Sequence, residues 1–352
     1  MLGEVILKLK SKFFRSFTGR ESSSSGCDAE IGVVSNSQII VDPDEESYAA
    51  GIEKRVEYIL SPGIFYIKNH IDDLLESVLE GFHREKYIPR IGLEIEFYAP
   101  RIDKLEALAA EVNKFSKLID ISLAGTTEEV GYRQFEIDLN PYTDIKKLIS
   151  DFTVLKNFLT DGNFSATFDA MPIDGQPRSA LQISVSIASE YGENLFAKNS
   201  GEESELLLNS VAGILETTNR FLPLYIKSTE NLLVFDLEFN KIEHLQKRNP
   251  VPTYNSWGLN NRSCSIRIPT PKNFRSKDEY KLECETGRRL EFRVPSSDCD
   301  IKCAIFGVLY SVLYGIVNKL KPSVEATSNN VLEHHDSYRK IAIEDSICDF
   351  LI

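Results

Sequence analysis

The sequence contains five short segments in which hydrophobic and polar residues alternate. They are 91–97, 133–139, 181–187, 263–268 and 288–294. Because successive side chains of a strand point to opposite faces of a sheet, each segment is predicted to be a strand with one apolar and one polar face. The polar faces carry Glu94, Glu96, Gln134, Glu136, Asp138, Gln182, Ser184, Ser186, Ser263, Ser265, Arg267, Arg289, Glu291 and Arg293.

The segments around these strands show the spacing of helices. Within 64–86, for example, Ile71, Leu74 and Val78 recur at intervals of three and four residues. The helices predicted in this way cover 46–60, 64–86, 103–118, 144–160 and 203–221. The long apolar stretch 303–317 is shorter than the ~20 residues that cross a bilayer, so we expect a buried core helix and no membrane span.

Together these elements predict an α+β fold. A curved, mainly antiparallel sheet of about six strands would be backed by helices, with its polar face concave. The polar, serine-rich run at 20–29 indicates a linker. We therefore expect a variable leader and linker at 1–45, a helical segment at 46–89, a sheet domain at 90–320 and a C-terminal extension at 321–352.

Composition narrows the possible functions. The net charge of −13 argues against nucleic acid as the main partner, because phosphate backbones are bound by clustered Lys and Arg. The sequence has no HExxH pattern, which argues against a zinc hydrolase. Its six cysteines form no CxxC pair and are expected to be free thiols in a reducing compartment, so we expect a cytoplasmic protein.

The chemistry of the polar strand faces is more specific. An ordinary antiparallel sheet with a hydrated face would account for alternation, but such a face normally mixes in Lys and Thr. Here the faces carry carboxylates, amides, hydroxyls and arginines, without Lys. Converging carboxylates repel one another unless cations intervene, and Mg²⁺ or Mn²⁺ prefer oxygen ligands. Arginines grip phosphates or carboxylates, so the combination indicates a phosphoryl-transfer site.

The same segments resemble the catalytic domain of the glutamine synthetase superfamily, in the order in which that family has them. The matching stretches, from about Ile91 to Lys319, are GLEIEFY, EEVGYRQFEI, PTYNSWGLNNRSCSIRIP, RRLEFRVP and AIFGVLYSVLYGI. The NRSxxIRIP and RRxExR patterns together are specific to the family. The resemblance implies a divergent member of the superfamily.

The resemblance implies a role for each matched residue. One metal ion, Mg²⁺ or Mn²⁺, would be held by Glu96, Glu129 and Glu136. The second, next to the phosphates of ATP, would be held by Glu94 and Glu291, with Gln182 at the third position. Phosphates would be bound by Arg262, Arg267 and Arg289, of which Arg262 and Arg289 would be catalytic. The carboxylate of the amino-acid substrate would be bound by Arg293, with His244 aligned to a further substrate-binding arginine.

The sequence departs from the family at the second metal. The family has a histidine at the position of Gln182 and another at the position of Ser184. An amide oxygen binds Mg²⁺ but lacks the nitrogen donor that favours Mn²⁺.

Further departures lie on the substrate side. Pro177 and Arg178 replace an Asn-Gly pair that contacts substrate, and Pro250 replaces a glutamate of the flap that covers it. His244, or Arg248 after a small shift, stands at the position of the substrate-binding arginine. The N-terminal β-grasp domain of the family is not evident in residues 1–90.

We therefore expect an ATP- and Mg²⁺-dependent carboxylate–amine ligase that forms a γ-glutamyl or related amide through an acyl phosphate. Its partners would be small molecules, namely ATP, glutamate or a similar acid, and an amine, and it could form a homo-oligomer. A catalytically inactive protein that binds nucleotide and metal is the alternative. A third possibility is that the carboxylates and arginines form structural ion pairs only. Geometry discriminates among these, because metal ligands must approach a common point.

Overall fold

The structure of the chain is a computed structural model. It describes residues 62–342 except for 163, 174, 199–200, 229, 236–250, 271–285 and 334. The leader predicted at 1–45 and the helix predicted at 46–60 lie outside the described residues, as do His244, Arg248 and Pro250.

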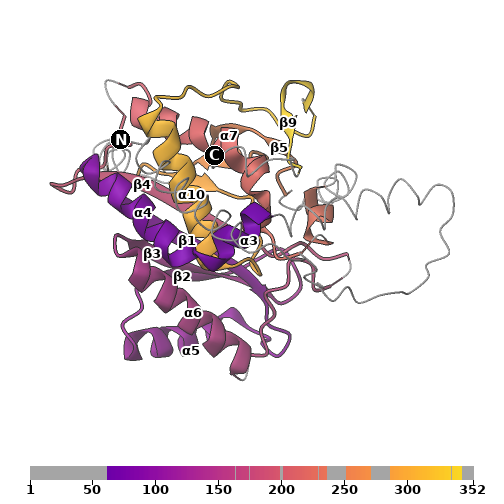
Figure 1. Cartoon of the computed structure of the whole chain (residues 1–352). Helices are drawn as coiled ribbons and strands as arrows, with labels where there is room; N and C mark the ends of the chain where they lie inside the picture. Colours follow the sequence, from indigo (N-terminus) through magenta and orange to yellow (C-terminus); the bar gives the residue numbers. More distant parts are fainter. Residues whose placement is uncertain are drawn as a thin grey trace, which may run out of the picture.

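A seven-stranded sheet forms the centre of the described part of the chain (Figure 1). Its strands are β1 (Tyr87–Tyr98), β2 (Leu123–Glu128), β3 (Gln134–Tyr142), β4 (Leu181–Ser189), β6 (Trp257–Leu259), β7 (Ile266–Ile268) and β8 (Leu290–Phe292). Their order across the sheet is β2–β3–β1–β4–β8–β7–β6, and each neighbouring pair is antiparallel except β6 and β7. The predicted α+β class with a mainly antiparallel sheet is confirmed. Two further strands, β5 (Tyr254–Asn255) and β9 (Arg339–Lys340), pair separately.

Helices back this sheet. The described α-helices are α3 (Pro62–Asn69), α4 (Ile71–Arg84), α5 (Leu105–Leu118), α6 (Ile145–Asp161), α7 (Glu205–Tyr225) and α10 (Ile301–Val317). Short 3₁₀-helices lie at η1 (Glu230–Phe235) and η2 (His335–Ser337). Helix α10 packs between α7 and α4, while α5 and α6 contact β2 and β3 at the other end of the sheet (Figure 1).

The apolar faces of the strands form the contact with the helices. On β1, Leu93, Ile95 and Phe97 are each 2% exposed or less, and Ile183 and Val185 on β4 are fully buried. All five belong to the main hydrophobic core. Burying such side chains stabilises the fold by about 1.5–3 kcal/mol each. Because this face is sealed by helices, the polar face is left for the site.

The elements differ from the predicted ones in two places. The segment 64–86 is two helices, because the backbone at His70 leaves the helical region (φ −119°, ψ 20°). Strand β2 was not predicted, since LAGTTE has small and polar residues without alternation. Its pairing with β3, rather than its own hydrophobic pattern, makes it a strand.

The apolar stretch at 303–317 is a buried helix, as predicted. Asp300 caps α10 by accepting hydrogen bonds from the backbone N–H groups of Lys302 and Cys303. Where α10 crosses α7 the two backbones touch. A Cβ on Gly213 would lie 2.0 Å from the carbonyl oxygen of Ser311, so only glycine fits there. Among the described residues, no helix has the length and apolarity that crossing a membrane requires.

The substitution Gly213→Ala should therefore destabilise the protein by about 3 kcal/mol or more, because the added methyl group must push the two helices apart. Urea unfolding followed by circular dichroism would measure this. Gly125→Ala is the matched control, since its Cβ would meet only one oxygen of Asp138 at 3.7 Å. Equal stability of both variants would contradict the helix contact.

Candidate active site

The strand register places the predicted polar residues on one face of the sheet. Glu94 lies opposite Asp138 on β3 and opposite Gln182 on β4, and Glu96 lies opposite Glu136. Directly opposed residues in neighbouring strands point to the same side. Carboxylates from two strands are thereby brought side by side with an amide from a third.

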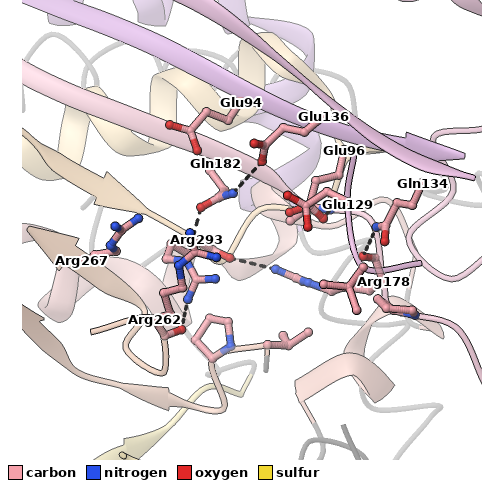
Figure 2. A pocket seen from close by; sticks show the side chains of 15 residues that line it. Glu94, Glu96, Glu129, Gln134, Glu136, Arg178, Gln182, Arg262, Arg267 and Arg293 are labelled. Atoms are coloured by element: carbon pink, nitrogen blue, oxygen red, sulfur yellow. Dashed lines mark hydrogen bonds between the residues drawn. The ribbon is translucent and has the colours of Figure 1, made fainter. Parts of the chain in front are cut away.

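Three carboxylates form a compact group at one end of this face. One ligand oxygen from each of Glu96, Glu129 and Glu136 lies within 4.8 Å of the other two (Figure 2). Glu96 comes from β1 and Glu136 from β3, whereas Glu129 comes from the turn that joins β2 to β3. The structure thus brings together the residues that the sequence predicts for the first metal.

The turn that carries Glu129 is held by a buried glutamine. The side chain of Gln134, 1% exposed, accepts a hydrogen bond from the N–H of Gly131 and donates one to the carbonyl of Arg178. Arg133 has a positive φ of 59°, and its guanidinium donates to the carbonyl of Pro100 and to the carboxylate of Asp103. These contacts fix the turn, and the turn positions Glu129.

Arginines line the same pocket as the carboxylates. The pocket residues are Glu94, Glu96, Glu129, Val130, Gln134, Glu136, Pro177, Arg178, Ala180, Gln182, Val251, Pro252, Arg262, Arg267 and Arg293. Anionic and cationic side chains therefore face one another across a single cavity (Figure 2). Such a cavity is able to hold a cation on one side and phosphate or carboxylate groups on the other.

Crowding shifts the protonation of the carboxyls. Burial, followed by repulsion from Glu96, Glu94, Asp138 and Glu129, raises the pKa of Glu136 to about 10. Burial also raises the pKa of Glu94 to about 7, with Glu291 as the next cause, and that of Glu96 to about 7, with Glu129 as the next cause. Arg178 and Arg293 oppose the shift of Glu96 only in part. A divalent cation would supply the missing positive charge.

The residues predicted for the second metal are differently engaged. Glu291 is 1% exposed, and each of its oxygens lies 3.2 Å from a guanidinium nitrogen of Arg267, while Arg293 lies 3.6 Å away. Gln182 donates to Glu136 at 3.1 Å and accepts from Arg293 at 3.3 Å. Both side chains are therefore occupied by protein partners, and their role as metal ligands stays a prediction.

The predicted phosphate-binding arginines are divided between two cavities. Arg262 and Arg267 line the pocket described above, whereas Arg289 lines a neighbouring cavity of about 460 Å³. Glu94 lines both cavities. The cavity around Arg289 is further lined by Arg90, Gly92, Leu93, Ala124, Asp138, Leu139, Pro141, Ser184, Ser186, Thr286 and Gly287.

One buried arginine of the pocket, Arg178, has no role that the sequence predicts. Arg178 is 5% exposed, donates to the carbonyl of Arg293 at 2.8 Å, and lies over the ring of Phe235 at 5.6 Å. It ties the end of β8 to the segment before β4. From the sequence it stood out only as a departure from the family pattern, because neither its burial nor its partners can be read from one chain.

Comparison with known proteins supports the resemblance seen in the sequence. The family profile described as "Glutamine synthetase, catalytic domain" matches residues 84–347. The chain is 27% identical over 257 residues to gamma-glutamylputrescine synthetase PuuA of Escherichia coli K12, covering 71% of this chain and 50% of that relative. It is 28% identical over 221 residues to a glutamate–isopropylamine ligase of a Pseudomonas species, covering 61% and 43% respectively. The chain thus spans half or less of the length of these two relatives.

Solved structures agree on the fold. A structure described as apo GmaS without ligand superimposes with a TM-score of 0.59 at 17% identity, covering 77% of this chain and 63% of that one. At this identity the likeness concerns the fold alone.

The raised pKa values predict how stability depends on pH and metal. Glu94, Glu96 and Glu136 bind protons more tightly in the folded state than at their ordinary value of 4.5. Without metal, they make the free energy of unfolding fall as pH rises from about 4.5 to about 7, and further towards 10 through Glu136. Bound Mg²⁺ favours the ionised carboxylates, so the stabilisation by Mg²⁺ should grow over this range.

Urea unfolding in EDTA and in saturating Mg²⁺, at steps from about pH 5 to about pH 8, would test this. A difference between the two conditions that stays constant with pH would contradict the charge crowding. Glu136→Gln should make the pH dependence in EDTA shallower.

Proposed function

The chain belongs to the glutamine synthetase catalytic-domain family, and we propose that it is an ATP- and Mg²⁺-dependent ligase that joins a carboxylate of glutamate or a similar acid to an amine. The observation that carries the proposal is the convergence of Glu96, Glu129 and Glu136 on one point, in a pocket also lined by arginines.

The donor set suits a hard divalent cation. Three carboxylate oxygens within 4.8 Å of one another match the oxygen coordination that Mg²⁺ and Mn²⁺ prefer. Burial, followed by repulsion between the carboxylates, raises the pKa values of Glu96 and Glu136, and such an ion would favour their ionised forms. When bound, the ion supplies positive charge for phosphoryl transfer.

The arginines are proposed to receive ATP and the acid. Arg262, Arg267 and Arg289 would bind the phosphates and neutralise the charge that spreads over them during transfer. Arg293 would face the carboxylate of the acid. In the first step, the terminal phosphoryl group of ATP passes to the side-chain carboxylate, giving an acyl phosphate and ADP. In the second, the amine attacks the acyl carbon, phosphate leaves, and the amide forms.

The amine is proposed to be an alkylamine or a diamine. Two relatives are named for putrescine and isopropylamine, which argues for including such amines beside ammonia. Pro177 and Arg178 line the pocket where the family has an Asn-Gly pair that contacts substrate. Because this contact is changed, the proposed acid is glutamate or a similar acid rather than glutamate alone.

Wider features of the protein stay predictions. We keep 90–320 as the proposed catalytic unit, with 46–89 as a helical segment and 321–352 as an extension. A homo-oligomer and a cytoplasmic location likewise remain predictions.

One assay separates an active ligase from an inactive binder. Release of ADP from ATP and Mg²⁺ should depend on both an acid and an amine, screened with glutamate, related dicarboxylic acids, ammonia, putrescine and isopropylamine. Glu129→Gln should lower the rate about 100-fold or more, because it removes a ligand of the cation. Glu128→Gln is the matched control, since this neighbouring side chain is exposed and lies outside the pocket.

Thermal melts of the same proteins decide what a negative assay means. A rise in Tm with Mg²⁺ and ATP that is lost in Glu129→Gln, without turnover under any pair of substrates, would favour the inactive binder. An unchanged Tm at saturating ligand would reject both and leave the carboxylates and arginines as structural ion pairs.

A further inference from the structure

A second group of carboxylates lies beside the first and includes a residue to which the sequence gave no role. Ligand oxygens of Glu94, Glu136 and Asp138 lie within 4.8 Å of one another. Glu94 and Asp138 are directly opposed on β1 and β3, and Glu136 precedes Asp138 by two positions on the same face. Glu136 therefore belongs to both groups.

Polar atoms at this place lack partners within the protein. The Oδ1 atom of Asp138 is buried and has no hydrogen-bond partner among the described residues. Ser184, only 6% exposed, has its Oγ in the same condition and lines the same cavity as Glu94 and Asp138. Buried polar groups are normally satisfied, so two such atoms at one cavity wall indicate a ligand.

Two of the three residues that the resemblance assigns to the second cation, Glu291 and Gln182, are committed elsewhere. Glu291 is held by Arg267 and Arg293, and Gln182 bridges Glu136 and Arg293. Moving Glu291 to a cation would leave a buried arginine without its carboxylate, which costs several kcal/mol. Asp138 requires no such exchange, because its Oδ1 already lacks a partner.

We propose that the second divalent cation is held by Glu94, Glu136 and Asp138. Glu136 would then bind both cations. Asp138 would take the place of the histidine that the family has at the position of Gln182. This inference rests on the proposed metal-dependent function and specifies its donor set. The set contains oxygen only, which favours Mg²⁺ over metals that prefer nitrogen.

Counting bound Mn²⁺ tests the donor set without relying on activity. Mn²⁺ would be titrated into the metal-free full chain, and the free ion measured by its paramagnetic resonance signal. The wild type should bind two ions, and Asp138→Asn should lose one, or bind it at least about tenfold more weakly. Asp120→Asn is the matched control, because the same exchange is made at an exposed residue that lines neither of the two cavities.

Two further variants identify which site is lost. Gln182→Ala should still bind two ions. Loss of one ion in Gln182→Ala but not in Asp138→Asn would overturn the inference in favour of the donors expected from the family. Glu129→Gln should lose the other site. If the wild type binds a single ion, which Glu129→Gln removes and Asp138→Asn does not, the inference fails while the proposed function stands. No binding at all would reject both.

A thermal melt in EDTA shows whether Asp138→Asn loses an ion because it misfolds. Asp138→Asn removes one of several repelling carboxylates, so its Tm without metal should equal or exceed that of the wild type. A lower Tm in EDTA would show that Asp138 has a structural role, and would count against the inference.

Discussion

Charge balance at the polar face is the constraint on which the rest of the site depends. Helices seal the apolar face of the sheet, so its hydrophobic core fixes the register of β1, β3 and β4. That register forces Glu94, Glu96 and Glu136 together, and burial followed by mutual repulsion raises their pKa values. The free energy of packing therefore maintains an arrangement that the charges alone would disperse.

The two sides of the polar face differ in how their carboxylates are balanced. On the β8 side, Glu291 is neutralised by the guanidinium groups of Arg267 and Arg293. On the β3 side, ligand oxygens of Glu136, Asp138 and Glu94 lie within 4.8 Å of one another. The negative charge of the polar face is thus balanced by arginines on the β8 side, whereas carboxylates gather on the β3 side. Gln182 stands at the boundary, with its amide touching a carboxylate and a guanidinium.

Much of this could be predicted from the sequence because period-two alternation identifies both the strand and its face. The group Glu96, Glu129 and Glu136 was found through the family pattern, since Glu129 lies in a turn, which alternation cannot identify. Other features depend on tertiary contacts. Strand β2 exists through its pairing with β3. Arg267 lies 24 residues from Glu291, and the carbonyl that accepts from Arg178 at 2.8 Å lies 115 residues away in the sequence. Such pairings leave no local signal.

The left-handed backbone of Arg133 has a consequence beyond the turn it shapes. A residue with a Cβ costs about 1–2 kcal/mol in this conformation, which glycine adopts freely. In return, the arginine reaches Pro100 and Asp103, which lie between β1 and α5. The turn bearing Glu129 is thereby tethered to the periphery of the fold. A substitution in the loop between β1 and α5 is therefore able to shift the carboxylate of Glu129 through Arg133, without touching the pocket itself.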